Sequence, residues 1–276
     1  MTSRVWVNGR VLEQSDALVS AFDHGFTVGD GVFETTKVVD GAPYALTRHL
    51  DRLARSARGL GLPEPDLALV RHAIDDTLAE NDTSAPLRLR LTYTGGVSPL
   101  GSDRGSAGPT LVVAVAPVKD WPETAAVATV PWPRNERAAT AGLKTTSYAD
   151  NVIALAHAKA RGADEAVFAN TRGELCEGTG SNVFVVLGDR LVTPRLSSGC
   201  LAGVTRSLVV EWLVVEEADL PVEVLAEADE VFLTSATRDV QGVHRVDGRD
   251  LPGAPGPVTR AAAKVFVERS ADELDP

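Results

Sequence analysis

Lysine is rare in this sequence, so each lysine can be judged by its surroundings. Only five lysines occur in the chain. Lys119, Lys159 and Lys264 lie where solvated charges are expected, the first near prolines and the others on predicted helices. Lys144 stands apart, because AGLKTTSYADN puts it between a proline-rich approach and a predicted helix start. A lysine amine is activated by desolvation, and since nothing local shows desolvation, an ordinary surface lysine is the competing interpretation.

Two segments further along the chain carry polar groups in glycine-rich surroundings. Glu177 lies in GELCEGTGSNVFVV, where a flexible stretch meets a hydrophobic strand, and a polar loop residue is the simpler interpretation. In CLAGVTRSLVV, Gly203 lets a backbone come close, and Val204 and Thr205 open a predicted helix. The N–H groups of a helix start, assisted by the Thr205 hydroxyl, can bind a phosphate. Many helices begin in this way without binding anything.

The segment GDGVFETTK, residues 29–37, predicts a turn followed by a strand with polar groups on both faces. Strand alternation puts Phe33, Thr35 and Lys37 on one face. The opposite face would carry Val32, Glu34, Thr36 and Val38. Since neither face is cleanly apolar, the strand is either a structural element or the wall of a reactive site.

Hydrophobic periodicity predicts hairpins interleaved with helices. RVWVNGRVL, residues 4–12, reads as a hairpin around Asn8-Gly9. Thr47 is expected to cap a helix that ends near residue 60, and a second helix starts near Asp66. Further helices are predicted over 148–161, 203–215 and 258–270. Strands are predicted over 88–94, 110–116, 164–170, 182–186, 190–194, 230–234 and 240–246.

This order of elements is typical of an α+β protein with two layered domains and not of one parallel doubly wound sheet. Prolines at 117, 122, 131 and 133 indicate a junction between the domains. We expect an N-terminal small α/β domain over 1–117, a linker over 118–132 and a C-terminal domain over 133–276.

Composition excludes several classes of function. The net charge of -11, with no basic run, argues against a nucleic-acid or anionic membrane surface. No apolar stretch of about 18 residues occurs, and MTSRVWVNGR lacks the apolar core of a signal peptide, so a cytoplasmic protein is expected. Cys176 and Cys200 form neither a CxxC pair nor part of a histidine cluster, so neither a metal site nor a disulfide framework is predicted.

Five motifs occur in an order that resembles one enzyme group. They are GDG-x-F-E, H-x-D-R-L, a lone lysine, E-G-x-x-S-N-V-F and G-V-T-R, and the likeness runs from residue 5 to about 245. This order resembles the fold-type-IV pyridoxal-phosphate enzymes, which include the branched-chain and D-amino-acid aminotransferases and aminodeoxychorismate lyase. The resemblance implies two α/β-type domains with mixed or antiparallel sheets, pyridoxal 5'-phosphate held by the C-terminal domain, and a homodimer.

Carried over residue by residue, the resemblance implies that Lys144 forms the Schiff base with pyridoxal phosphate and later moves protons. Glu177 would pair with the pyridine nitrogen and keep it protonated. Arg52 would bind the phosphate, although from the residues alone it falls off the buried helix stripe and reads as a solvated arginine. The remaining cofactor contacts implied are Tyr148, Val204, Thr205, Ser235 and Ala236.

The same resemblance puts Phe33, Thr35 and Lys37 on the substrate side of the cofactor. Threonine at the position of Thr35, with alanine at that of Ala236, is typical of the lyase, in which the threonine is implicated in proton transfer. We therefore expect conversion of 4-amino-4-deoxychorismate to 4-aminobenzoate and pyruvate, a step toward folate, with Thr35 and Lys144 catalytic. An arginine often found near Leu100 for a substrate carboxylate is absent, and Arg104 is the expected substitute.

Two alternatives remain open from the sequence. The first is an aminotransferase acting on branched-chain or D-amino acids or chiral amines. The second is a cofactor-binding protein that has lost catalysis, against which the presence of Lys144 and Glu177 argues.

Overall fold

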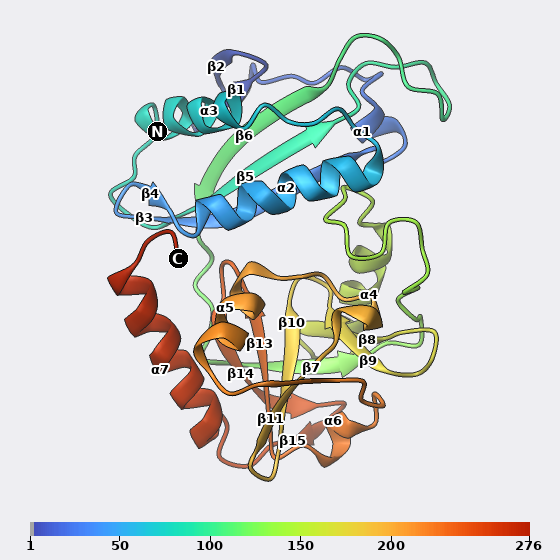
Figure 1. Ribbon diagram of the computed structural model, residues 1–276, viewed down its shortest axis with the longest axis vertical. Coiled ribbons are helices and arrows are strands. Elements are labelled where there is room, and N and C mark those ends of the chain that lie inside the picture. Colours follow the sequence, from blue (N-terminus) through green and yellow to red (C-terminus); the bar gives the residue numbers. More distant parts are fainter. Residues whose placement is uncertain (1–2) are drawn as a thin grey trace. The chain divides into compact units, whose positions relative to one another are not determined.

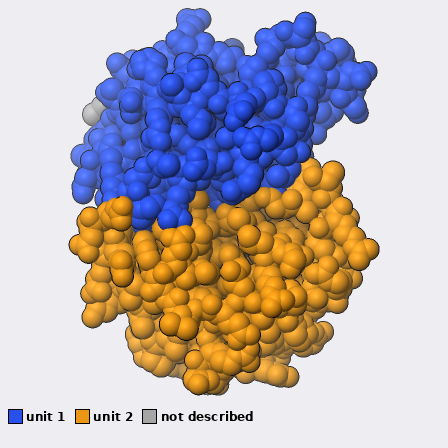
Figure 2. All heavy atoms as spheres, viewed as in Figure 1, with its two compact units in different colours: residues 1–119, 143–148, 274–276 blue, residues 120–142, 149–273 orange. Residues whose placement is uncertain are grey.

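The computed structural model describes residues 3–276 (Figure 1). The chain divides into two compact units, coloured separately in Figure 2. Unit 1 comprises residues 1–119, 143–148 and 274–276, and unit 2 comprises 120–142 and 149–273. The expected linker over 118–132 contains β7 (Thr124–Thr129), which is a strand of the unit 2 sheet. Residues 143–148, expected in the C-terminal domain, are part of unit 1.

Over its described residues, unit 1 contains a six-stranded sheet in the order β2-β1-β6-β5-β3-β4. Every neighbouring pair in it is antiparallel. The strands are β1 (Arg4–Val7), β2 (Arg10–Glu13), β3 (Gly31–Val39), β4 (Ala42–Pro43), β5 (Leu87–Thr94) and β6 (Thr110–Pro117). Asn8 and Gly9, at φ 44° and 90°, form the β1–β2 turn, so the predicted hairpin is confirmed.

Two helices, α2 and α3, pack on one face of this sheet (Figure 1). The helices of unit 1 are α1 (His24–Thr27), α2 (Leu46–Leu60) and α3 (Leu67–Ala79). Leu50 and Leu53 of α2 and Ile74 of α3 pack with alternate apolar residues of β5 and β6 in one core. Because strand side chains alternate, Phe33, Thr35 and Lys37 of β3 lie on the face away from these helices.

Of the two helix starts predicted in unit 1, the structure confirms the one near Asp66 and does not confirm Thr47 as a cap. Asp66 caps α3 by accepting hydrogen bonds from the N–H groups of Ala68 and Leu69, as its sequence position predicts. Thr47 does not cap α2, which begins one residue earlier, after Ala45 in a left-handed conformation. The carboxylate of Asp275 instead accepts bonds from the Thr47 amide, at 2.8 Å, and from its hydroxyl. That partner lies more than 200 residues away, so local sequence could not reveal it.

Unit 2 contains a nine-stranded mixed sheet over its described residues, in the order β12-β11-β10-β13-β14-β7-β8-β9, with β15 on β14. The pairs β14–β7, β7–β8 and β11–β12 are parallel. The strands besides β7 are β8 (Glu165–Ala169), β9 (Leu175–Gly178), β10 (Asn182–Leu187), β11 (Arg190–Pro194), β12 (Glu216–Ala218), β13 (Glu230–Ser235), β14 (Asp239–Val246) and β15 (Arg249–Asp250).

The helices of unit 2 are α4 (Ala149–Ala160), η1 (Leu196–Ser198), α5 (Val204–Trp212), α6 (Val224–Glu227) and α7 (Pro257–Asp272). The small side chains of Ala154 and Ala158 let α4 pack closely on β7 and β8. Helix α5 contacts β13, and helix α7 contacts both β13 and β14. The predicted α+β class with antiparallel and mixed sheets is confirmed.

Among the helices of residues 3–276, none combines the length and the apolar character needed to cross a membrane.

Candidate functional site

The segment containing Lys144 is held against the edge of β3. The Phe33 amide donates to the Lys144 carbonyl at 3.0 Å, and the Thr146 amide donates to the Gly31 carbonyl at 2.8 Å. A bridge between Val32 and Thr145 lies between these bonds. Antiparallel partners point to the same side of a sheet, so the side chains of Lys144 and Phe33 share one face.

In unit 1, three side chains surround the ring of Phe33. Lys144 Nζ lies 4.3 Å from the ring centroid, and the Arg90 guanidinium carbon lies 3.7 Å from it. Tyr148 meets the ring edge-on, with 5.3 Å between ring centroids. Three of the predicted residues, Phe33, Tyr148 and Lys144, therefore come together, and both cations are within cation–π range of one ring.

Thr35 and Lys37 follow Phe33 along the same face of β3. In the register of the sheet, Thr35 lies opposite Arg90 and Lys37 lies opposite Arg88, both on β5. Sequence reasoning overlooked these two arginines. The signal was available, because the alternation in RLRLTYT puts both of them on the face of β5 away from its leucines.

The opposite face of β3 carries a buried charge cluster. Glu34 Oε1 accepts a bond from Arg52 Nε at 2.8 Å, and its Oε2 accepts one from Arg52 Nη2 at 2.7 Å. Burial opposes ionisation of Glu34, but the Arg52 charge and the bonds from Arg52 and His49 hold the Glu34 pKa well below its usual range. Arg52 is only 4% exposed, so the solvated arginine expected from the helix stripe is not found.

His49 completes this cluster. Its Nδ1 lies 2.7 Å from Glu34 Oε2, and its side chain is almost fully buried. Desolvation lowers the pKa of His49; hydrogen bonding to Glu34 opposes this shift, and the nearby charges of Arg52 and Lys144 add to it. A neutral imidazole that donates from Nδ1 to Glu34 satisfies this geometry.

Arg104 has a structural role that the sequence did not reveal. Its Nη2 and Nε donate to the Asp30 carboxylate at 2.6 and 2.7 Å. The same guanidinium donates to the carbonyls of Leu60 and Gly61, where α2 ends. The hydrogen bond from Arg104 is the main cause that lowers the Asp30 pKa. Because the guanidinium joins a loop to a helix terminus, we withdraw Arg104 as the candidate for binding a substrate carboxylate.

In unit 2, the half-buried carboxylate of Glu177 is oriented by its neighbours. Its Oε2 accepts the Leu201 amide at 2.8 Å, and its Oε1 lies 3.2 Å from Arg134 Nε. Arg134 is itself held by a bond from Nη1 to Asn151 Oδ1 at 3.0 Å and by the ring of Phe168. This acid is therefore part of a built arrangement and not a mobile loop residue.

The segment that contains Leu201, whose amide binds Glu177, leads directly into helix α5. Asn182 Nδ2 donates to the Leu201 carbonyl at 2.8 Å, and a Cβ on Gly203 would collide with Asn182 Oδ1. Val204 and Thr205 begin the helix and are buried. Within the described residues, no side chain caps this helix start. Its first N–H groups thus keep the partial positive charge that attracts anions.

Ser235 and Ala236 lie where β13 turns into β14. The Ser235 hydroxyl accepts the Arg238 amide at 3.3 Å, and Arg238 Nη2 donates to the buried Glu165 carboxylate at 2.6 Å. Glu165 also accepts bonds from the amide and hydroxyl of Thr179. One buried ion pair therefore anchors both the 235–238 turn and the loop after Glu177. Sequence reasoning gave no role to Glu165 or Arg238, since neither lies in a recognisable motif.

The cysteines are buried thiols. Burial, more than any neighbouring charge, raises the pKa of Cys176, and it raises that of Cys200 to about 11. Within residues 3–276, no group of His, Cys, Asp and Glu side chains is arranged to hold a metal ion.

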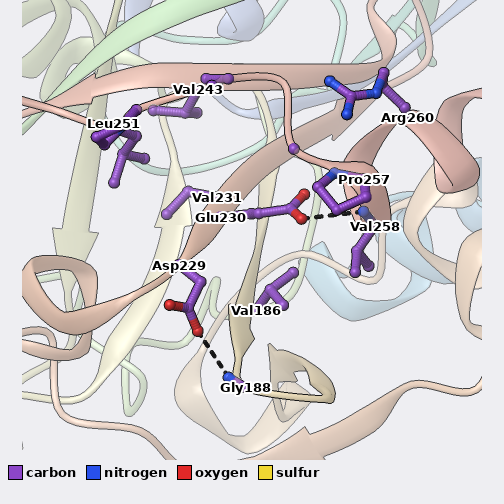
Figure 3. Close-up of a pocket in the computed structure, with 14 residues that line it drawn as sticks. Val186, Gly188, Asp229, Glu230, Val231, Val243, Leu251, Pro257, Val258 and Arg260 are labelled. Carbon is purple, nitrogen blue, oxygen red and sulfur yellow. Dashed lines mark hydrogen bonds between the residues drawn. The ribbon is translucent and has the colours of Figure 1, made fainter.

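A pocket elsewhere in unit 2 contains none of the predicted site residues (Figure 3). Two acids, Glu230 and Asp229, point toward it, but both have structural partners. Glu230 accepts the amides of Val258 and Thr259 at the start of α7, and Asp229 accepts the amide of Gly188. We therefore attribute no chemistry to this pocket.

This chain is similar in sequence to known proteins over most of its length. The model of the amino-transferase class IV family matches residues 31–246. A putative branched-chain-amino-acid aminotransferase of Methanocaldococcus jannaschii is 33% identical, covering 96% of each chain. The aminodeoxychorismate lyase of Bacillus subtilis is 30% identical, over 95% of this chain and 93% of its own.

A solved structure with the same fold is a hypothetical aminotransferase from Mycobacterium tuberculosis in a PLP-bound form. It is 29% identical, covers 98% of this chain and 100% of its own, and has a TM-score of 0.87.

Proposed function

Because this chain belongs to the amino-transferase class IV family, we propose that it is a pyridoxal-phosphate-dependent lyase that converts 4-amino-4-deoxychorismate to 4-aminobenzoate and pyruvate, a step toward folate. Family membership makes the protein an enzyme, and pyridoxal 5'-phosphate is the cofactor of the family. The choice of the lyase reaction over amino transfer is the proposed part.

The residues of this chain fit the cofactor by the chemistry of their donors. Val204 and Thr205 offer helix N–H groups, and the Thr205 hydroxyl adds a further donor for a phosphate. The absence of a Cβ at Gly203 lets the loop pass close to Asn182. The carboxylate of Glu177, oriented by the Leu201 amide, matches a protonated ring nitrogen.

When bound, pyridoxal phosphate supplies a ring that accepts electrons from the substrate carbon being deprotonated. Glu177 would keep a proton on the ring nitrogen by accepting a hydrogen bond from it. Lys144 would hold the cofactor covalently, and its amine, once released by the substrate amine, would take the proton from the substrate ring carbon. Arg52, whose guanidinium plane is fixed by Glu34, would bind the phosphate. Tyr148, Ser235 and Ala236 would complete the cofactor contacts.

The position of Thr35 carries the choice of the lyase. Its side chain belongs to the β3 face that Phe33 and Lys144 share, two residues beyond the ring that Lys144 Nζ contacts. A hydroxyl there could deliver a proton to the departing enolpyruvyl group, and such acid catalysis is typically worth about 10² to 10⁴ in rate. The similarity to the lyase of Bacillus subtilis supports this choice.

The alternative is an aminotransferase that acts on branched-chain or D-amino acids or chiral amines. The similarity to the putative branched-chain aminotransferase of Methanocaldococcus jannaschii favours it. It would use the same Lys144 and Glu177, but would require a 2-oxo acid as the amino acceptor.

One assay separates the two reactions. The purified protein is mixed with 4-amino-4-deoxychorismate and, in parallel, with an amino acid plus 2-oxoglutarate. We expect 4-aminobenzoate and pyruvate in equal amounts from the first mixture. Efficient amino transfer without an aromatic product would establish the alternative. A Lys144→Ala variant that kept full activity, or a protein without cofactor absorbance, would refute the enzyme assignment.

Substitution of Thr35 tests the residue that distinguishes the lyase. Thr35→Val is expected to lower lyase turnover by about 10² or more while cofactor absorbance is retained. Thr35→Ser keeps the hydroxyl and serves as the matched control, with turnover close to that of the unchanged protein. Loss of the cofactor in Thr35→Val would assign Thr35 to cofactor binding instead.

We also propose that the protein acts as a homodimer in the cytoplasm. Large apolar side chains near the start of unit 1 support an oligomer, since Leu18 and Phe26 are 79% and 78% exposed. Sedimentation equilibrium is expected to give twice the chain mass of 29.1 kDa, and a monomer at all concentrations would contradict the proposal.

A further inference from the structure

The buried carboxylate of Glu165, at the start of β8, joins two separate segments of unit 2. Its Oε1 accepts hydrogen bonds from the amide of Thr179, at 3.1 Å, and from the Thr179 hydroxyl. Its Oε2 accepts a bond from Arg238 Nη2 at 2.6 Å and a longer one, of 3.4 Å, from the hydroxyl of Ser181. One acid therefore binds a loop through two of its residues and a turn through a third.

The two segments lie just beyond the point where two strands stop pairing. The register of β10 with β13 ends at the pair formed by Asn182 and Thr234. Beyond this pair, one chain leads back to residues 179–181 and the other continues into the turn 235–238. Because ladder hydrogen bonds join only the paired residues, the backbone of these two strands does not connect the two segments. The bonds to Glu165 connect them instead.

The guanidinium of Arg238 is oriented by further contacts. Its Nη1 donates to Gln241 Oε1 at 3.4 Å, and its central carbon lies 4.1 Å from the ring centroid of Trp121, within cation–π range. Gln241 is itself held by a bond from Nε2 to the Pro122 carbonyl at 2.8 Å. These contacts fix the direction in which Arg238 presents Nη2 to Glu165.

The same arginine positions Ser235, which is a proposed cofactor contact. The Arg238 amide donates to the Ser235 hydroxyl oxygen at 3.3 Å. A hydroxyl that accepts a bond in this way still has its own hydrogen to donate. An anion bound at the turn would therefore meet a hydroxyl whose oxygen is already held in place.

Stability alone is a poor explanation for this ion pair. The side chains of Arg238 and Glu165 are 8% and 1% exposed, so both charges have lost most of their contact with water. The cost of this desolvation offsets much of the attraction between two buried charges, and apolar residues of similar size are often at least as stabilising. What the pair adds here is a single arrangement of the two segments that it joins.

We propose that Glu165 and Arg238 are positioning residues of the cofactor site. Their ion pair keeps the turn that carries Ser235 and Ala236 aligned with the segment that follows Glu177. Both residues act through the segments that they hold, and neither takes part in the reaction. The inference rests on the proposed function only in placing the cofactor at these segments, and it is the same for a lyase and for an aminotransferase.

Cofactor affinity tests the inference without turnover. Equilibrium dialysis of the purified holoenzyme, followed by absorbance, measures the dissociation constant of pyridoxal 5'-phosphate. Glu165→Gln and Arg238→Gln should each weaken binding by about 10- to 100-fold, a loss typical of removing a group that orients binding residues. Arg238→Lys keeps a positive charge beside Glu165 and should recover most of the affinity. The double variant should bind within about threefold of the weaker single variant, because the two residues act through one interaction.

Glu230→Gln is the matched control. Glu230 is also a buried acid of unit 2, and it accepts the amides of Val258 and Thr259 at the start of α7, in a part of the unit that contains none of the proposed cofactor contacts. This variant should lose stability in urea unfolding and keep its cofactor affinity. If Glu165→Gln does not fold, Arg238→Gln and Arg238→Lys provide the test.

Two results would overturn the inference. One is a cofactor affinity that neither Glu165→Gln nor Arg238→Gln changes. The other is an equal loss of affinity in Glu230→Gln, because the loss would then follow from lower stability and not from the position of the two segments.

The outcome is separable from that of the lyase assay. A protein that transfers amino groups and forms no 4-aminobenzoate refutes the proposed lyase, and weaker cofactor binding by its Arg238→Gln variant would still support the inference. A protein that forms 4-aminobenzoate, and whose Arg238→Gln variant binds the cofactor with unchanged affinity, keeps the lyase and refutes the inference.

Discussion

Glu34 on β3 holds Arg52 on α2 through two parallel hydrogen bonds of 2.8 and 2.7 Å, with both side chains buried. The pair joins the sheet of unit 1 to the helix that packs on it. Glu34 is the neighbour in sequence of both Phe33 and Thr35, which face the other way. A structural ion pair on one face of β3 thus fixes the backbone that presents the proposed substrate residues on the other.

We first predict that Glu34→Gln lowers the free energy of unfolding by about 3 to 5 kcal/mol, because it leaves the buried Arg52 charge without its counterion. Urea unfolding followed by circular dichroism measures the change. Glu216→Gln, which removes the exposed pair with Arg190, is the control and should alter the stability little. Equal effects of the two substitutions would show that the buried pair has no special role.

The second prediction concerns pH. The His49 pKa in the folded protein lies below the ordinary value of 6.5, so below pH 6.5 the unfolded chain takes up a proton that the folded protein does not. Stability should therefore fall as the pH decreases from about 6.5, with a slope of at most about 1.4 kcal/mol per pH unit from this group. Glu34, whose folded pKa is also lowered, adds its own loss only below its ordinary value of 4.5.

Unfolding free energies measured between pH 7 and 5 check this dependence. His49→Gln should flatten the slope, whereas His72→Gln should not, because His72 is 68% exposed on α3. A slope that is unchanged by His49→Gln would assign the pH dependence to other groups.

Third, Arg104→Gln is expected to act on stability and not on substrate binding. The variant loses the bonds to Asp30 and to the end of α2, and the partly exposed site makes the cost about 1 to 2 kcal/mol. Chemical unfolding measures the loss, and the KM of the amino substrate should stay unchanged. A raised KM at unchanged stability would restore Arg104 as a substrate residue.

Fourth, Gly203→Ala should lower the affinity for pyridoxal phosphate by about tenfold or more, an effect of at least about 1.4 kcal/mol. The added Cβ would collide with Asn182 Oδ1, and the loop before α5 would have to move together with its N–H donors. Release of the cofactor, followed by absorbance during dialysis, measures the affinity. Gly180→Ala is the control, since a Cβ there meets nothing within 4 Å. Equal retention of cofactor by the two variants would contradict the role of Gly203.

Local patterns predicted most of the elements because each depends on residues close in the chain. The Asn8-Gly9 hairpin, the Asp66 cap and the alternation of β5 need only a few neighbouring residues. The start of α2 could not be predicted, because Asp275 supplies its capping carboxylate. The role of Arg104 was missed for the same reason, since Asp30 and the end of α2 are remote in sequence.

The sequence by itself determined the family, the identity of the lysine and acid proposed to act on the cofactor, and the face of β3 on which Thr35 lies. These follow from motif order and from the two-residue period of a strand. Only the tertiary structure decided which groups each arginine contacts. Arg52 and Arg104 have carboxylate partners, whereas Arg90 packs on Phe33 beside Lys144. The physical reason is that the partner of a charged side chain often belongs to a segment that is distant in sequence. The residues next to the charge in the chain therefore do not reveal which partner it contacts.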